Sequence, residues 1–203
     1  MKVTPVFDTN ELKDLFEDMT KEIWPCIDFK PKTYLNTYLY KPKADIETIY
    51  NGMSGKQSEV TWQQRTKTFD LDSGILYYIY FDYDNSEIGK EDWLHTYAFV
   101  HKDLNAIGKP YMNQFKNAYA DCGNNIWFSY MKTETYFDWH IDGPFYRYHQ
   151  VLKNDGITPS FTNLNNEVYC SVGEAFIEYA GESHMVKPNT LDRLHLVTTV
   201  NKL

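Results

Sequence analysis

The sequence predicts a mainly β protein with buttressing helices, built around a double-stranded β-helix, the cupin-like jelly roll. Three observations predict this fold. Short strand-like segments separated by turn residues fill the region after Gly123. Helical patterns come before them, which favours a buttressing region over 1–123 and core strands over 124–203. The chain has 203 residues and no repeat or linker, so we expect a single domain over 1–203.

The first element expected is a helix over residues 8–25. Asp8 and Glu11 resemble a capping box, and the apolar residues that follow recur at helical spacing. Pro25 is expected to end this helix, because proline cannot continue the backbone hydrogen-bond ladder. A weaker pattern predicts a second helix over 44–51.

The next elements are a strand, a third helix and the strands of the core. The run at 74–84 is apolar and aromatic almost throughout, which is typical of a buried strand. A helix is expected from Pro110 to Gly123, and with the second helix it should pack against a sheet. The core strands are expected at 126–132, 136–142, 145–152, 167–179, 184–186 and 192–200.

Composition and charge exclude several classes of protein. The net charge of −8 repels phosphate backbones, so we expect no nucleic-acid partner. No stretch reaches the roughly 18 apolar residues of a membrane span, and the start of the chain lacks a signal-peptide core. Cys26, Cys122 and Cys170 form no CxxC pair, as in proteins of reducing compartments. We therefore expect a cytoplasmic protein without a membrane partner.

Histidines cluster in the last third of the chain and indicate a metal site. His140 and Asp142 are two residues apart, so in a strand both side chains would point to one face. His184 follows about two strands later, and in a jelly roll a returning strand can bring it beside this pair. Two imidazoles and one carboxylate leave open positions on a metal, which suits non-haem Fe(II). The alternative is that both histidines are ordinary polar residues at strand ends.

Arginine is rare in this chain, and two of its three arginines lie in the histidine-rich region. Strand alternation places Arg193 and His195 on one face, and likewise Arg147 and His149. A guanidinium grips a carboxylate with two parallel hydrogen bonds, so an inward arginine in a barrel indicates an anionic ligand. The alternative for each arginine is an ion pair at the rim of the barrel.

Together these segments resemble a known family. Ser129, HIDGPFYRYHQVL, GEAFIEYAGESHMV and PNTLDRLHLV resemble the aspartyl/asparaginyl β-hydroxylase-like branch of the Fe(II)/2-oxoglutarate-dependent oxygenases. The resemblance covers roughly residues 125–200. It implies a double-stranded β-helix with iron held by three residues, which are His140, Asp142 and His184.

The resemblance also implies how the cosubstrate binds. 2-Oxoglutarate would chelate the iron through its keto acid end, while Arg193 pairs with its far carboxylate, helped by Ser129. His149 would lie near the first carboxylate. Arg147 matches an arginine of the family that contacts a carboxylate, and whether this carboxylate belongs to the cosubstrate or to the substrate stays open. A role of His195 in the site also stays open.

Two features depart from the family pattern. Some animal members lack the carboxylate ligand, whereas this chain has Asp142. Arg193 also follows His184 one residue sooner than in many relatives, which requires a tighter turn.

Three functions are compatible with these residues. The first is a hydroxylase that uses Fe(II), 2-oxoglutarate and O2 to oxidise an unactivated C–H bond, with an amino acid or a peptide residue as substrate. The second is a jelly-roll module that binds metal without catalysis. The third is a cupin-like metalloenzyme that does not use 2-oxoglutarate. The sequence leaves the oligomeric state open.

Overall fold

The structure, a computed structural model, describes residues 1–23, 30–31, 38–39, 60–64, 76–82, 96–101 and 104–203. Its helices are α1 (Thr9–Ile23) and α3 (Leu104–Ala118). Its strands are β1 (Lys2–Val3), β2 (Lys30–Pro31), β3 (Tyr38–Leu39), β4 (Val60–Gln64), β5 (Leu76–Asp82), β6 (Thr96–His101), β7 (Cys122–Met131), β8 (Phe137–His140), β9 (Tyr146–Lys153), β10 (Phe161–Asn163), β11 (Glu167–Val168), β12 (Ala175–Tyr179), β13 (His184–Val186) and β14 (Arg193–Val200).

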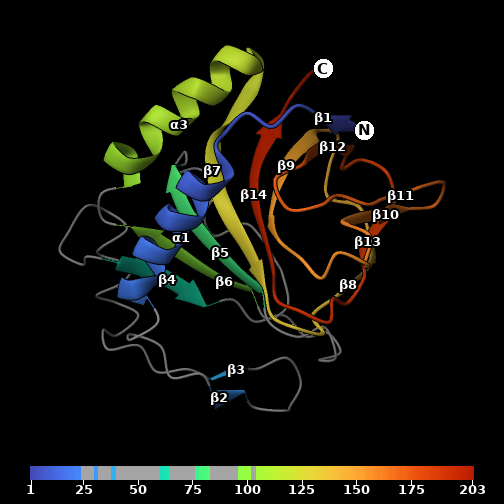
Figure 1. Cartoon of the computed structure of the whole chain (residues 1–203), viewed down its shortest axis with the longest axis horizontal. Coiled ribbons are helices and arrows are strands. Elements are labelled where there is room, and N and C mark those ends of the chain that lie inside the picture. Colours follow the sequence, from blue (N-terminus) through green and yellow to red (C-terminus); the bar gives the residue numbers. More distant parts are fainter. Residues whose placement is uncertain (24–29, 32–37, 40–59, 65–75, 83–95, 102–103) are drawn as a thin grey trace.

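Two sheets form the jelly roll that the sequence predicts (Figure 1). The large sheet has the order β1-β12-β9-β14-β7-β5-β6-β4, and the small sheet has the order β11-β10-β13-β8. Among the described strands, only β5 and β6 pair in parallel, and every other pairing is antiparallel. The predicted double-stranded β-helix is therefore confirmed, and strands β4 to β6 of the first half extend its large sheet.

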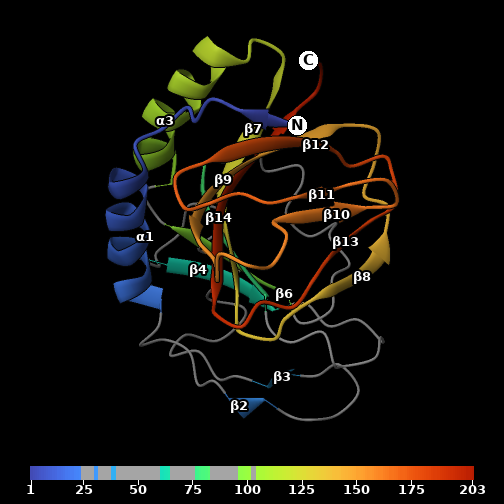
Figure 2. The same ribbon diagram turned by 45° about the vertical axis from the view of Figure 1, so that its right-hand side comes forward.

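The two helices cover the outer face of the large sheet, as Figure 2 shows. Phe16 of α1 packs edge-on against Phe128 of β7, with ring centroids 5.3 Å apart. Phe115 of α3 packs against Tyr148 of β9 at 5.0 Å. These contacts belong to one buried apolar cluster that also holds Leu196 of β14. Burial of this surface ties the helices to the sheet, so the expected buttressing role is confirmed for both.

Local chemistry explains where α1 begins. The Asp8 carboxylate accepts hydrogen bonds from the backbone N–H groups of Asn10 and Glu11, both at 2.9 Å. These are two of the N–H groups that a helix start leaves without a helical partner. The Glu11 carboxylate accepts a hydrogen bond from the Tyr111 hydroxyl at 3.1 Å and so links α1 to α3.

The predicted bounds of the third helix were wrong at both ends. Helix α3 begins at Leu104 and contains Pro110, because the burial of Met112 and Phe115 against the sheet offsets the lost backbone hydrogen bond. Gly123 does not end it, since it lies in β7. A Cβ at Gly123 would lie 3.0 Å from the Thr199 Cβ, so this glycine permits the close approach of β7 and β14.

The predicted strand at 167–179 is in fact two strands that lie in different sheets. Val168 belongs to β11 of the small sheet, whereas β12 of the large sheet begins at Ala175. Gly173 lies between them with a φ of 93°, a conformation that ends an extended run. Strand β10 was not predicted. The expected strand at 74–84 is present as β5. The expected helix over 44–51 lies outside the described residues.

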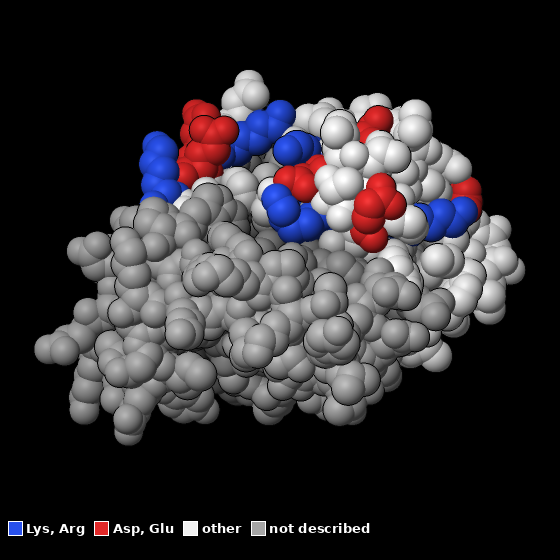
Figure 3. All heavy atoms as spheres, turned by 90° about the horizontal axis from the view of Figure 1, so that it is seen from below, with Lys and Arg blue, Asp and Glu red and all other residues white. Residues whose placement is uncertain are grey.

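The described surface carries charges of both signs. Figure 3 shows basic and acidic side chains side by side on the described part of one face. Lys132 pairs with Asp192 in this way at 3.2 Å, and Lys21 pairs with Asp18 at 2.6 Å. No helix within the described ranges is long and apolar enough to cross a lipid bilayer.

Candidate metal centre and its cavity

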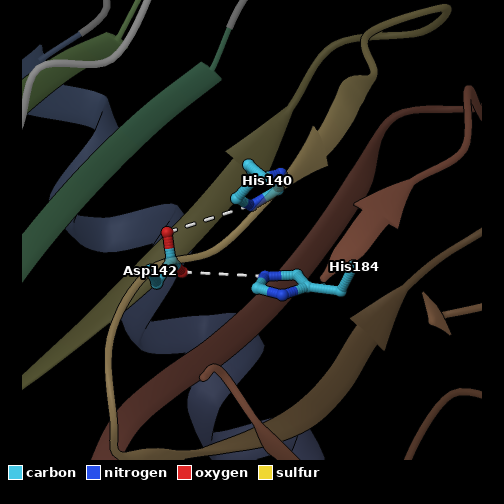
Figure 4. Close-up of side chains that lie close together, drawn as sticks. All are labelled: His140, Asp142 and His184. Atoms are coloured by element: carbon cyan, nitrogen blue, oxygen red, sulfur yellow. Dashed lines mark ion pairs between the residues drawn. The ribbon is translucent and has the colours of Figure 1, made fainter. Parts of the chain in front are cut away.

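Three side chains, those of His140, Asp142 and His184, lie close together, as Figure 4 shows. His140 ends β8 and lies directly opposite His184 of β13, because these residues are register partners in the small sheet. The strand expected through Asp142 stops at His140. Asp142 instead lies in the following loop, where its backbone N–H donates to the Ala180 carbonyl at 3.0 Å.

The donor atoms of these residues are arranged to share one metal ion. The Nε2 atoms of His140 and His184 lie 3.9 and 3.7 Å from the two carboxylate oxygens of Asp142. One donor atom from each residue lies within 4.8 Å of the others. Neighbouring donors around an ion bound at about 2.1 Å are roughly 3 Å apart, so small side-chain movements would complete coordination. Two imidazoles and a carboxylate suit Fe(II) and other divalent transition metals.

The electrostatics keep the Asp142 carboxylate ionised, as a metal ligand must be. Burial alone would raise the pKa of Asp142, but the interaction with the nearby His184 imidazole and the charge of Arg147 outweigh it and lower the pKa. The Arg147 Nη2 atom lies 3.0 Å from Asp142 Oδ2. Arg147 therefore orients a candidate ligand from the side, and its guanidinium also lies over the Phe145 and Trp127 rings.

His149 has a carboxylate partner that the sequence analysis did not identify. Its Nε2 lies 3.0 Å from Glu178 Oε1, and the Glu178 side chain is only 5% exposed. Burial lowers the pKa of His149, while the hydrogen bond from His149 outweighs the effect of burial on Glu178 and lowers the pKa of that carboxyl. The pair is thus a neutral imidazole donating to a carboxylate, and it carries one negative charge.

A chain of hydrogen bonds leads from this pair to Arg193. The Arg193 Nε–H group donates to His195 Nε2 at 3.1 Å. His195 Nδ1 lies 3.4 Å from His149 Nδ1, so the two imidazoles are neighbours in one series of contacts. Burial, together with the charge of Arg193, lowers the pKa of His195 well below its usual value, so this imidazole is neutral. The series runs from Arg193 through both imidazoles to Glu178.

Arg193 and Ser129 line the same cavity as the three metal-site residues. Arg193 is buried, and its Nη2 atom donates to the Ser160 carbonyl at 2.6 Å and lies 3.2 Å from His195 Nδ1. The cavity has a volume of about 50 Å³, which is room for a metal ion and a few water molecules. All seven residues expected to form the site line it: Ser129, His140, Asp142, Arg147, His149, His184 and Arg193.

Strand alternation contained a signal for Glu178. Phe176 and Glu178 are two residues apart in β12, and both line the cavity, while Ile177 between them belongs to the outer core. An inward Phe176 therefore implies an inward Glu178. His195 follows the same rule in β14, where Leu194 and Leu196 face the helices.

Comparisons with known proteins give only distant structural likenesses. No family model and no curated protein match the chain. A viral collagen prolyl hydroxylase from Paramecium bursaria Chlorella virus-1 is 10% identical, with 100% of this chain and 89% of that one covered and a TM-score of 0.46. A Pseudomonas putida prolyl-4-hydroxylase is 10% identical over 100% and 92%, with a TM-score of 0.43. An RmlC-like cupin protein from Desulfovibrio desulfuricans is 14% identical over 41% and 81%, with a TM-score of 0.31.

Proposed function

We propose that this protein is an Fe(II)- and 2-oxoglutarate-dependent oxygenase that hydroxylates an unactivated C–H bond of an amino acid, free or within a peptide. The observation that carries the proposal is the joint placement of a His-His-Asp cluster and a buried arginine on one cavity. A metal with open positions binds one end of a keto acid, and a buried guanidinium binds a carboxylate at its other end. Sequence resemblance to the aspartyl/asparaginyl hydroxylase-like branch supports the same assignment.

The charges that line the cavity support a dianionic ligand. The carboxylates of Asp142 and Glu178 balance the guanidiniums of Arg147 and Arg193. The imidazoles of His149 and His195 are neutral because burial lowers their pKa values. A divalent cation would therefore leave two positive charges in excess, which the two carboxylates of 2-oxoglutarate neutralise.

In this proposal the chain positions the reactants and excludes water. His140, Asp142 and His184 hold the metal, while Arg193, helped by Ser129, binds the far carboxylate. When bound, Fe(II), 2-oxoglutarate and O2 supply the oxidative decarboxylation and the oxidant.

A second candidate is a cupin-like metalloenzyme that does not use 2-oxoglutarate. The pairing of His149 with Glu178 favours it, because the resemblance assigns this histidine to a carboxylate of the cosubstrate. Arg147 likewise has a carboxylate partner within the chain, Asp142. A cation such as Arg193 at the far side of the cavity has no role in that alternative.

The test is the visible charge-transfer band of the iron chelate under anaerobic conditions. Fe(II) with 2-oxoglutarate should give this band in the parent protein, and O2 should then release succinate. His184→Ala should abolish both signals. Met185→Ala is the matched control, because Met185 is the next residue of β13 and does not line the metal cavity. Absence of the band in the parent protein would exclude the proposal.

A further inference from the structure

Glu178 is a buried acidic residue that the proposed function leaves without a role. It lies in β12, directly opposite Arg147 of β9, and its side chain faces the cavity. Its Oε1 atom accepts the hydrogen bond from His149. Its Oε2 atom is buried and has no hydrogen-bond partner among the described residues. No described donor bonds to this oxygen, so the carboxylate charge is less completely compensated than one with hydrogen bonds to both oxygens.

The position of this charge matters for any anion that binds beside the metal. His149 stacks on the Phe176 ring at 4.7 Å with an interplanar angle of 3°, so the imidazole plane is fixed. One ring nitrogen faces Glu178 and the other faces His195. His149 is therefore already bonded to a carboxylate of the chain, and a second carboxylate arriving here would meet a negative charge.

We propose that Glu178 is a specificity-determining residue, whose buried negative charge beside His149 weakens the binding of carboxylates next to the metal. A ligand with a single carboxylate that binds the metal lacks a second carboxylate for Arg193, so no contact with this guanidinium offsets the repulsion. A dicarboxylate also gains the contact with the Arg193 guanidinium, which lines the same cavity. Glu178 thereby makes binding depend on the second carboxylate, and this consequence rests on the proposed function.

The experiment compares Glu178→Gln with the parent protein, using the full chain saturated with Co(II). Glutamine retains the size of the side chain and an acceptor for His149 but removes the charge. Visible absorption of Co(II) reports ligands that enter its coordination sphere, independently of turnover. We expect acetate and 2-oxoglutarate each to bind about tenfold or more tightly to the variant, since the repulsion acts over a short distance in a buried site.

Two further variants sharpen the test. Glu174→Gln removes an acidic residue just before β12 that pairs with Lys2 at the surface, and it should leave both affinities at the parental value. Glu178→Met removes the charge without adding a polar group and should act like Glu178→Gln, which covers the case of a glutamine variant that does not fold.

The outcomes separate this inference from the proposed function. Unchanged or weaker acetate binding in both Glu178 variants would overturn the inference. Tighter acetate binding supports it, even if 2-oxoglutarate binds no better than acetate in every variant. That second result would count against the 2-oxoglutarate proposal alone.

Discussion

Replacement of Arg193 tests the assignment of the far carboxylate most directly. Arg193 is 6% exposed, so a carboxylate paired with it would be shielded from water. Hydrogen bonds to charged groups contribute about 1.5–3 kcal/mol each. Loss of one or two of them in Arg193→Met should cost about 2–4 kcal/mol, which raises the Kd of 2-oxoglutarate roughly 30- to 1000-fold. Arg193→Lys retains the charge without the planar fork and should fall between the parent and Arg193→Met.

The assay is an anaerobic titration of the Fe(II)-loaded protein, followed by the chelate band. Pyruvate is the matched control ligand, since it has the same keto acid end but no far carboxylate. Arg193→Met should leave the pyruvate and Fe(II) affinities close to the parental values. If the variant binds 2-oxoglutarate as the parent does, the assignment is wrong. Equal losses for both ligands would show that Arg193 shapes the cavity rather than binding the far carboxylate.

Three further predictions concern stability. Asp8→Ala removes the α1 cap and should lower the free energy of unfolding by about 1 kcal/mol in urea titrations. Asp18→Ala, later on the same helix, is the control and should lower it by less than about 0.5 kcal/mol. Gly123→Ala should cost about 1–3 kcal/mol because the new Cβ crowds β14, and an unchanged melting temperature would contradict this. Burial would raise the pKa of Asp192, but the hydrogen bond from Tyr130 and others lower it from 3.8 to about 2. This carboxylate therefore stabilises the fold above pH 4, and its contribution disappears as the pH falls toward 2. Between these pH values, the free energy of unfolding of Asp192→Asn should fall less steeply than that of the parent protein.

The sequence predicts those elements whose chemistry is local. Asp8 caps α1 because its side chain reaches the N–H groups of the next residues. Alternation correctly separates Arg193 from Leu194, since one side of each strand faces the helices and the other faces the cavity. Elements decided by distant contacts were predicted less well. Gly123 was expected to stop a helix, but its reason for being glycine is Thr199, which is far along the chain.

The same distinction applies to the candidate site. The HxD spacing of His140 and Asp142 predicted that they lie together, although Asp142 lies beyond the strand and is held by the Ala180 carbonyl. The partner of each ionisable group could not be predicted. Whether Arg147 meets an acid of the chain or of a ligand depends on the path of the loop after β8, and here that loop brings Asp142 to it. The pairing of His149 with Glu178 likewise depends on how β9 pairs with β12.

The hydrogen-bond series from Arg193 to Glu178 connects four side chains that line the cavity, those of Arg193, His195, His149 and Glu178. Glu178 accepts from His149 at one end, and Arg193 lies against both ring nitrogens of His195 at the other. A ligand carboxylate that draws the Arg193 guanidinium toward itself would weaken the bond to His195 and, through it, the fixed orientation of His149. Under the proposed function, the far carboxylate at Arg193 and the first carboxylate near His149 would therefore contact two ends of one hydrogen-bonded series.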